Sequence, residues 1–130
     1  MKIALISQKI FKDKYNQINF SLEDKWINFF EKKKILLVPF FSQQKNIDLY
    51  FKKFKPSFVI ISGGSNNIFD FSRENILRKK IDSKLIQISI KKKIPILAVC
   101  YGFQYVTKLF GGKVIKSKNE LKKKQYIYIN

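Results

Sequence analysis

The sequence predicts an α/β fold in which a mostly parallel sheet carries helices on both faces. Short apolar runs of strand length alternate along the chain with longer segments whose apolar residues recur at helical spacing. This alternation is typical of βαβ units, which build a parallel sheet. With 130 residues, 45% of them hydrophobic, the chain is long enough to bury a core. We therefore expect residues 1–130 to form a single domain without internal repeats or linkers.

The first part of the chain predicts a strand, a loop and a helix. Residues 2–7 form an apolar run of strand length, and a polar loop is expected to follow through Asn19. Ser21, with Asp24 three residues later, predicts a helix N-cap, and the helix is expected to end near Lys33. The apolar residues expected on one face of this helix are Leu22, Trp26, Phe29 and Phe30.

Two more strands and a short helix are expected next. The apolar run at 35–40 predicts a second strand, which Pro39 is expected to interrupt near its end. Residues 46–54 predict a short helix capped by Asn46. A third strand is expected at 57–62, and it runs directly into a loop that begins with two glycines.

The second half of the chain begins with a long helix expected at 73–90, with its Lys and Arg residues pointing outward. Its expected core residues share one face and are Leu77, Ile81, Leu85 and Ile88. The continuous apolar run at 94–99 predicts a strand buried on both faces. A helix with Phe103, Val106 and Phe110 is expected after Cys100, ending at Gly111. Short strands are expected at 113–116 and 125–129.

The net charge of +18 raises the question of a nucleic-acid or membrane partner. Lysine is spread along the whole chain, whereas Arg73 and Arg78 are its only arginines. Proteins that read bases rely on the bidentate geometry of arginine, so we interpret the charge as a solvated basic surface. Nucleic-acid binding stays open as a less favoured alternative, and no membrane partner is expected.

A single cysteine excludes an internal disulfide and favours a reducing compartment. The apolar start of the chain is too short for a signal sequence. A cytoplasmic protein is expected on these grounds.

Cys100 is the principal candidate functional residue. It directly follows the apolar run at 94–99, and Gly102 permits a sharp turn from strand to helix. A thiolate is stabilised at the N-terminus of a helix. Gly63 and Gly64 follow another expected strand, so their N–H groups would converge on an oxyanion at the same edge of the sheet. A buried, inert cysteine and a plain glycine turn are the alternative interpretations.

These residues resemble a known family. The segment AVCYGFQ is similar to the G-x-C-x-G-x-Q nucleophile turn of class I glutamine amidotransferases, and ISGG and LFGGKV match segments of its γ-glutamyl hydrolase branch. The resemblance implies a three-layer flavodoxin-like fold and a γ-glutamyl thioester on Cys100. It also implies an oxyanion hole formed by the backbone N–H groups of Gly64 and Tyr101, and substrate binding by Gln104 and Gly63.

A finer resemblance concerns the substrate. The opening LISQK, the first expected helix and the segment LLVP are similar to the type that hydrolyses γ-glutamyl-CDP-amidate. The resemblance therefore implies glutamine or a γ-glutamyl amide, with a nucleotide-linked amide among the candidates, as the ligand, and no cofactor and no metal.

The sequence departs from the family pattern at several positions. Ala98 stands where the family has glycine, and Arg78 is followed by Lys79 and Asp82 in place of a fuller Arg-Asp and Glu cluster. The sequence contains no histidine and ends 30 residues after Cys100, before the expected His-x-Glu strand. The resemblance thus implies a fold incomplete at its C-terminus.

Several interpretations remain open because of the missing base. The chain is a truncated form, or a partner chain supplies His and Glu, or the activity is lost and the protein is a non-catalytic binding or regulatory module. A relative of the PfpI-like proteases and chaperones is a further alternative, although those proteins also usually pair the cysteine with a histidine.

Overall fold

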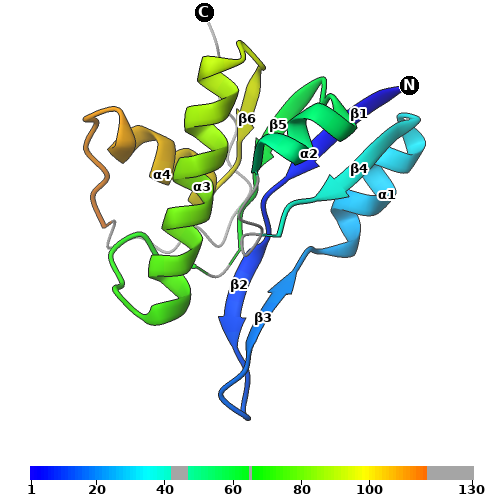
Figure 1. The fold of residues 1–130 in the computed structure, drawn as a ribbon. Helices are drawn as coiled ribbons and strands as arrows, with labels where there is room; N and C mark the ends of the chain where they lie inside the picture. The colour runs from blue at the N-terminus through cyan, green and yellow to red at the C-terminus, as the bar shows by residue number, and fades with distance from the viewer. Residues whose placement is uncertain (42–46, 65, 117–130) are drawn as a thin grey trace, which may run out of the picture.

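The computed structural model describes residues 1–41, 47–64 and 66–116, and its centre is a four-stranded parallel sheet (Figure 1). The strands, in the order in which they lie side by side, are β4 (Ile35–Pro39), β1 (Lys2–Ile6), β5 (Phe58–Ile61) and β6 (Ile96–Ala98). Numbered along the chain, these parallel strands have the order 2-1-3-4 of a flavodoxin-like sheet. The predicted α/β fold is confirmed.

Helices cover both faces of this sheet, as expected. They are α1 (Asp24–Lys32), α2 (Ile47–Phe54), α3 (Arg73–Lys91) and α4 (Tyr101–Leu109). Phe30 of α1 packs with Ala4, Ile6 and Ile60 on one face. Apolar residues of α2 and α3 pack against the other face, on Leu5, Val59 and Ile61. Alternate residues of β1 and β5 thus face opposite layers, and the two strands are buried on both sides.

A β-hairpin, which sequence reasoning missed, replaces the expected polar loop. Strands β2 (Lys9–Lys12) and β3 (Ile18–Ser21) pair antiparallel and project from the sheet as an arm (Figure 1). The turn is stabilised by Asp13, whose carboxylate accepts hydrogen bonds from the backbone N–H of Tyr15 and Gln17. Ser21 is therefore a strand residue, and Glu23 occupies the N-cap position of α1.

Two neighbouring phenylalanines of α1 have different environments. Phe30 is 3% exposed in the core, whereas Phe29 is 53% exposed. The predicted face of α1 was therefore only partly right.

The core face of α3 is as predicted. Ile81, Leu85 and Ile88 are buried, and Ser72 caps the helix by accepting a hydrogen bond from the Asn75 N–H. The prediction that the arginines of this helix point outward is wrong at Arg78, which is fully buried.

The last strand of the sheet is less buried than expected. Leu97 of β6 is 47% exposed, so the prediction of a strand buried on both faces is wrong. β6 pairs only with β5 among the described residues, so it is an edge strand of the described sheet. Residues 113–116 are not a strand. Asn46 and the strand expected at 125–129 lie outside the described residues.

Three helices are followed by a lysine with a left-handed backbone. Lys34, Lys55 and Lys93 have φ values of 55°, 42° and 55°. Lys55 is the first residue after α2, whereas Lys34 and Lys93 are the second residues after α1 and α3. Glycine is the usual residue at this position because a side chain is strained there. At the end of α4, Gly111 has φ 82°, as predicted. Across the described ranges, every helix is too short or too polar to span a membrane.

Candidate active site

Cys100 lies on a strained turn between β6 and α4. Its φ and ψ are 51° and −112°, a combination that costs energy for a residue with a side chain. The turn is held on both sides, because the Val99 N–H donates to the Ile61 carbonyl and the Gly102 N–H donates to the Val99 carbonyl. The cysteine itself is exposed. This is the strand-turn-helix geometry that presents a nucleophile at the carboxyl edge of a sheet.

Gly102 allows α4 to approach β5 closely. A Cβ atom at this position would lie 2.1 Å from the Ile61 carbonyl oxygen. No side chain fits at that distance, so the glycine fixes how closely the turn packs on the neighbouring strand.

The glycine loop after β5 lies beside the cysteine. A Cβ on Gly63 would be 3.2 Å from Cys100 Cβ and 4.0 Å from its Sγ. Gly64 has φ 126°, and a Cβ there would be 2.9 Å from Lys9 Cβ. The structure therefore brings together the two segments that the sequence singled out.

The other predicted site residues belong to α4. Tyr101, the first residue of the helix, is 1% exposed, and its ring stacks on that of Tyr105 at 6.2 Å. Gln104 is half-buried one turn after Cys100, and its N–H donates to the Cys100 carbonyl. The departure at Ala98 is accommodated, since its methyl group packs against the core.

A buried charged pair, Arg78 and Asp82, lies beneath this turn. Both residues were named from the sequence as part of a polar cluster, but neither their pairing nor their burial was predicted. The Arg78 Nε donates to Asp82 Oδ2 at 2.7 Å, and both side chains are 0% exposed. Arg78 Nη2 also donates to the Ser62 carbonyl at 2.7 Å, and the guanidinium lies 4.8 Å from the centre of the Tyr101 ring. The spacing of Arg78 and Asp82, four residues apart in a helix, was the available signal.

Burial changes the acid–base behaviour of this cluster. Loss of hydration raises the pKa of the Asp82 carboxyl, and the Arg78 guanidinium opposes that rise. Burial also raises the pKa of the Tyr101 phenol, and the nearby Asp82 carboxylate adds to this effect. Tyr101 is therefore a neutral phenol at physiological pH.

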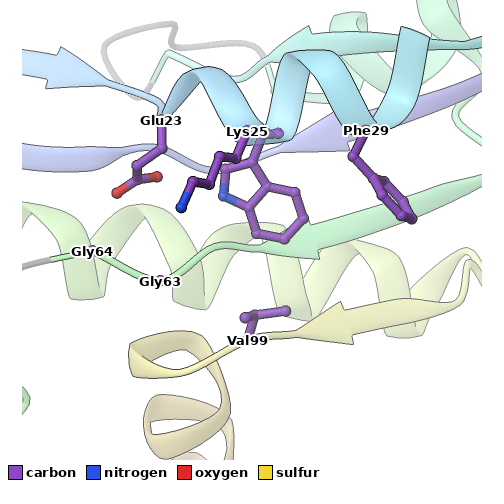
Figure 2. Close-up of a pocket in the computed structure, with 7 residues that line it drawn as sticks. Glu23, Lys25, Phe29, Gly63, Gly64 and Val99 are labelled. Atoms are coloured by element: carbon purple, nitrogen blue, oxygen red, sulfur yellow. The ribbon is translucent and has the colours of Figure 1, made fainter. Parts of the chain in front are cut away.

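A cavity of about 380 Å³ adjoins the glycine loop. Figure 2 shows Lys25 and Phe29 extending from α1, with Gly63 and Gly64 on the loop and Val99 from the end of β6. Its lining is largely apolar, and the charged side chains there are Glu23, at the N-cap of α1, and Lys25, in its first turn. The cavity thus lies between α1 and the two segments that meet at Cys100.

A cysteine on a strained turn at the carboxyl edge of a flavodoxin-like sheet, with a glycine loop beside it, defines an α/β protein with a candidate cysteine nucleophile. The profile of the family described as glutamine amidotransferase class-I matches residues 10–129. The chain belongs to this family, which confirms the resemblance found in the sequence.

Individual relatives cover the chain to different extents. The chain is 41% identical over 63 residues to a glutamine-hydrolyzing GMP synthase of Bacillus subtilis, covering 48% of this chain and 10% of the relative. A GMP synthase of Lactobacillus gasseri is 40% identical over 68 residues, 52% of this chain and 11% of the relative. The γ-glutamyl-CDP-amidate hydrolase of Campylobacter jejuni is 28% identical over 131 aligned residues, 98% of this chain and 64% of the relative. The chain thus spans about a tenth of the synthases and under two thirds of the hydrolase.

Proposed function

We propose that Cys100 is the nucleophile of a glutamine amidotransferase-type reaction on a γ-glutamyl amide. The observation that carries this proposal is the close approach of the glycine loop to the strained cysteine turn. A Cβ atom placed on Gly63 would lie 3.2 Å from Cys100 Cβ. In the proposed site the backbone N–H groups of Gly64 and Tyr101 stabilise the oxyanion. Gln104 and Gly63 contact the glutamyl group.

The proposed reaction proceeds through a thioester. The Cys100 thiolate attacks the γ-carbonyl carbon, and the tetrahedral intermediate places its negative oxygen on the two N–H groups. The carbon–nitrogen bond then breaks, and the amine leaves after it gains a proton. Water attacks the thioester next, which releases glutamate and restores the thiol.

Two proton transfers in this scheme need an acid–base group. The 130 residues contain no histidine, and we assign this role to a His and Glu pair from outside these residues, in a continuing chain or a partner chain. Residues 1–130 are then the N-terminal part of a single amidotransferase domain. Because a free thiol stays reduced in the cytoplasm, we propose that compartment for the reaction.

For the substrate we favour a nucleotide-linked γ-glutamyl amide. The support is the hydrolase of Campylobacter jejuni, named for γ-glutamyl-CDP-amidate, whose similarity extends over 98% of this chain. Lys9 packs against Gly64, and Lys25 lines the cavity beside it. These lysines suit a substrate that carries phosphate groups. Free glutamine is the alternative, supported by the GMP synthase relatives.

A glutamine analogue that carries a chloroketone tests the nucleophile. We expect it to alkylate Cys100 with saturable kinetics, detected by mass spectrometry, and we expect added glutamine or a γ-glutamyl amide to protect the thiol. Cys100→Ser is the control and should take no label. A labelling rate that rises linearly with reagent concentration and does not change when glutamine or a γ-glutamyl amide is added would refute the proposed site.

Turnover tests the assignment of the base. The 130-residue chain by itself is expected to release negligible ammonia or amine from γ-glutamyl amides, because no histidine is present. A normal turnover rate without an added polypeptide contradicts this assignment and requires another base within the chain.

The missing histidine also favours a second candidate, a non-catalytic binding module of the same fold. Such a module binds the γ-glutamyl ligand without cleaving it. Protection of Cys100 by the ligand, together with no turnover even when a His-bearing C-terminal polypeptide of the family is added, would favour the module over the enzyme.

A further inference from the structure

We infer that the buried Arg78–Asp82 pair has a positioning role: it holds the glycine loop and the cysteine turn, the two halves of the proposed oxyanion site, in a fixed position relative to each other. This inference rests on the proposed function, because it concerns the N–H groups of Gly64 and Tyr101. Neither side chain of the pair reaches solvent, so neither contacts a substrate directly.

The guanidinium holds the strand end that leads into the glycine loop. Nη2 donates to the Ser62 carbonyl at 2.7 Å, to Ser62 Oγ at 3.1 Å and to Ser7 Oγ at 3.2 Å. Ser62 directly precedes Gly63, and its own hydroxyl donates to the Ser7 carbonyl at 2.7 Å. One cation therefore fixes the carboxyl ends of β1 and β5 just before the chain enters the glycine loop.

The same guanidinium supports the cysteine turn from below. It lies 4.8 Å from the centre of the Tyr101 ring, within the range of a cation–π interaction. Tyr101 follows Cys100 directly, and its backbone N–H is the second proposed oxyanion donor. Arg78 also reaches Asn66 Oδ1 at 3.4 Å, on the far side of the glycine loop. Both segments of the proposed oxyanion site thus contact one side chain.

Asp82 fixes the direction of this side chain. Its Oδ2 accepts from Arg78 Nε at 2.7 Å, one helical turn along α3, which leaves Nη1 and Nη2 pointing toward the sheet. A helix of 19 residues is a rigid base for such a contact.

Stability alone is a weak reason for this arrangement. Replacing a buried ion pair with apolar residues of similar volume is often neutral or stabilising. Among the described residues, Asp82 Oδ1 and the Tyr101 hydroxyl are buried without any hydrogen-bond partner, which is a further cost. We attribute the cluster to the geometry that it imposes on the two loops.

The test compares three proteins. In the double variant Arg78→Met, Asp82→Leu both charges are removed together, so no unpaired charge is left in the core and the fold is expected to persist. Ser89→Ala is the matched control, since Ser89 is also a fully buried polar residue of α3, but its hydroxyl bonds within the helix, to the Leu85 carbonyl. The third protein is the unchanged chain.

Two reagents separate positioning from general reactivity. We expect the double variant to lose about tenfold or more in the saturable alkylation rate with the chloroketone glutamine analogue, because small misplacements of binding groups have large effects. Alkylation by iodoacetamide, which needs no oxyanion site, should stay within about twofold, since it reports only the thiol. Ser89→Ala should leave the ratio of the two rates unchanged.

Hydrogen exchange gives a readout that does not depend on the proposed function. The amides of Ser62 and Gly102, which donate to Ser7 Oγ and to the Val99 carbonyl, report on the two segments and should exchange about tenfold faster in the double variant, whereas amides of β1 should not change. An unchanged exchange pattern, or an equal loss of both alkylation rates, overturns the positioning role. If the unchanged chain shows no saturable labelling, the proposed function fails and the exchange result alone decides whether the pair orders the two loops.

Discussion

The close contact between α4 and β5 makes Gly102→Ala a sharp test of how the cysteine turn is built. The added Cβ would lie 2.1 Å from the Ile61 carbonyl oxygen and 2.7 Å from its carbon, whereas ordinary contacts begin at 3.4 Å. Helix and strand would have to separate by roughly 1.3 Å to restore an ordinary contact. The two Ile61 atoms belong to the backbone, so the strand itself would have to move. Overpacking costs about 1–3 kcal/mol or more, and alanine returns about 1 kcal/mol through its helix propensity.

We therefore expect Gly102→Ala to lower the free energy of unfolding by about 2 kcal/mol, measured by urea denaturation. The saturable labelling of Cys100 should fall as well, because the turn moves away from Gly63. Gly111→Ala is the control: a Cβ there meets no atom within 4 Å, so only the strain of its φ of 82° remains, about 1 kcal/mol. A Gly102→Ala protein as stable as the unchanged chain would refute the close approach.

Three further predictions concern the core, the loop and the hairpin. Phe30→Ala should lower the free energy of unfolding by about 3–5 kcal/mol, because its ring is buried. Phe29→Ala should lower it by about 1 kcal/mol or less, because that side chain is 53% exposed. Equal losses for the two variants in urea denaturation would contradict the packing of α1. Gly63→Ala should slow glutamine-analogue labelling by about tenfold, because its Cβ would press on Cys100 Cβ at 3.2 Å, while iodoacetamide labelling persists. The hydrogen bond from the Gln17 N–H lowers the pKa of the Asp13 carboxyl from its ordinary value, so the carboxylate stabilises the hairpin above that ordinary value and the stabilisation is lost as pH falls through the lowered pKa. Protection of the hairpin amides, relative to their intrinsic exchange rates at each pH, should fall over this range in the unchanged chain but not in Asp13→Asn.

Much of the fold was predictable from hydrophobic periodicity. The four parallel strands and four helices lie where apolar runs and helical spacing placed them, because burial on a sheet leaves a direct trace in the sequence. The hairpin β2–β3 was missed because its strands are short and project beyond the sheet, so little alternation of apolar residues was required.

The candidate site was predictable in part. Cys100 and the glycine loop were found because a sharp turn and a close backbone approach require particular residue types. The role of Arg78 was not predicted, because an arginine on a lysine-rich helix is expected to point into solvent. Its burial is possible because Asp82, one helical turn away, pairs with its charge. Neighbouring positions such as Phe29 and Phe30 differ in burial because the sheet covers only part of the helix.

The lysines at the ends of α1, α2 and α3 offer a route to a more robust protein. Replacing Lys34, Lys55 and Lys93 with glycine removes three strained left-handed side chains, each for a gain of about 0.5–1 kcal/mol. The same three changes reduce the net charge from +18 to +15. Because the sites are on separate helices, the gains should add, and thermal denaturation of the triple variant would report their sum. Crystallisation and binding assays on such a variant would proceed with less nonspecific attraction to anionic surfaces.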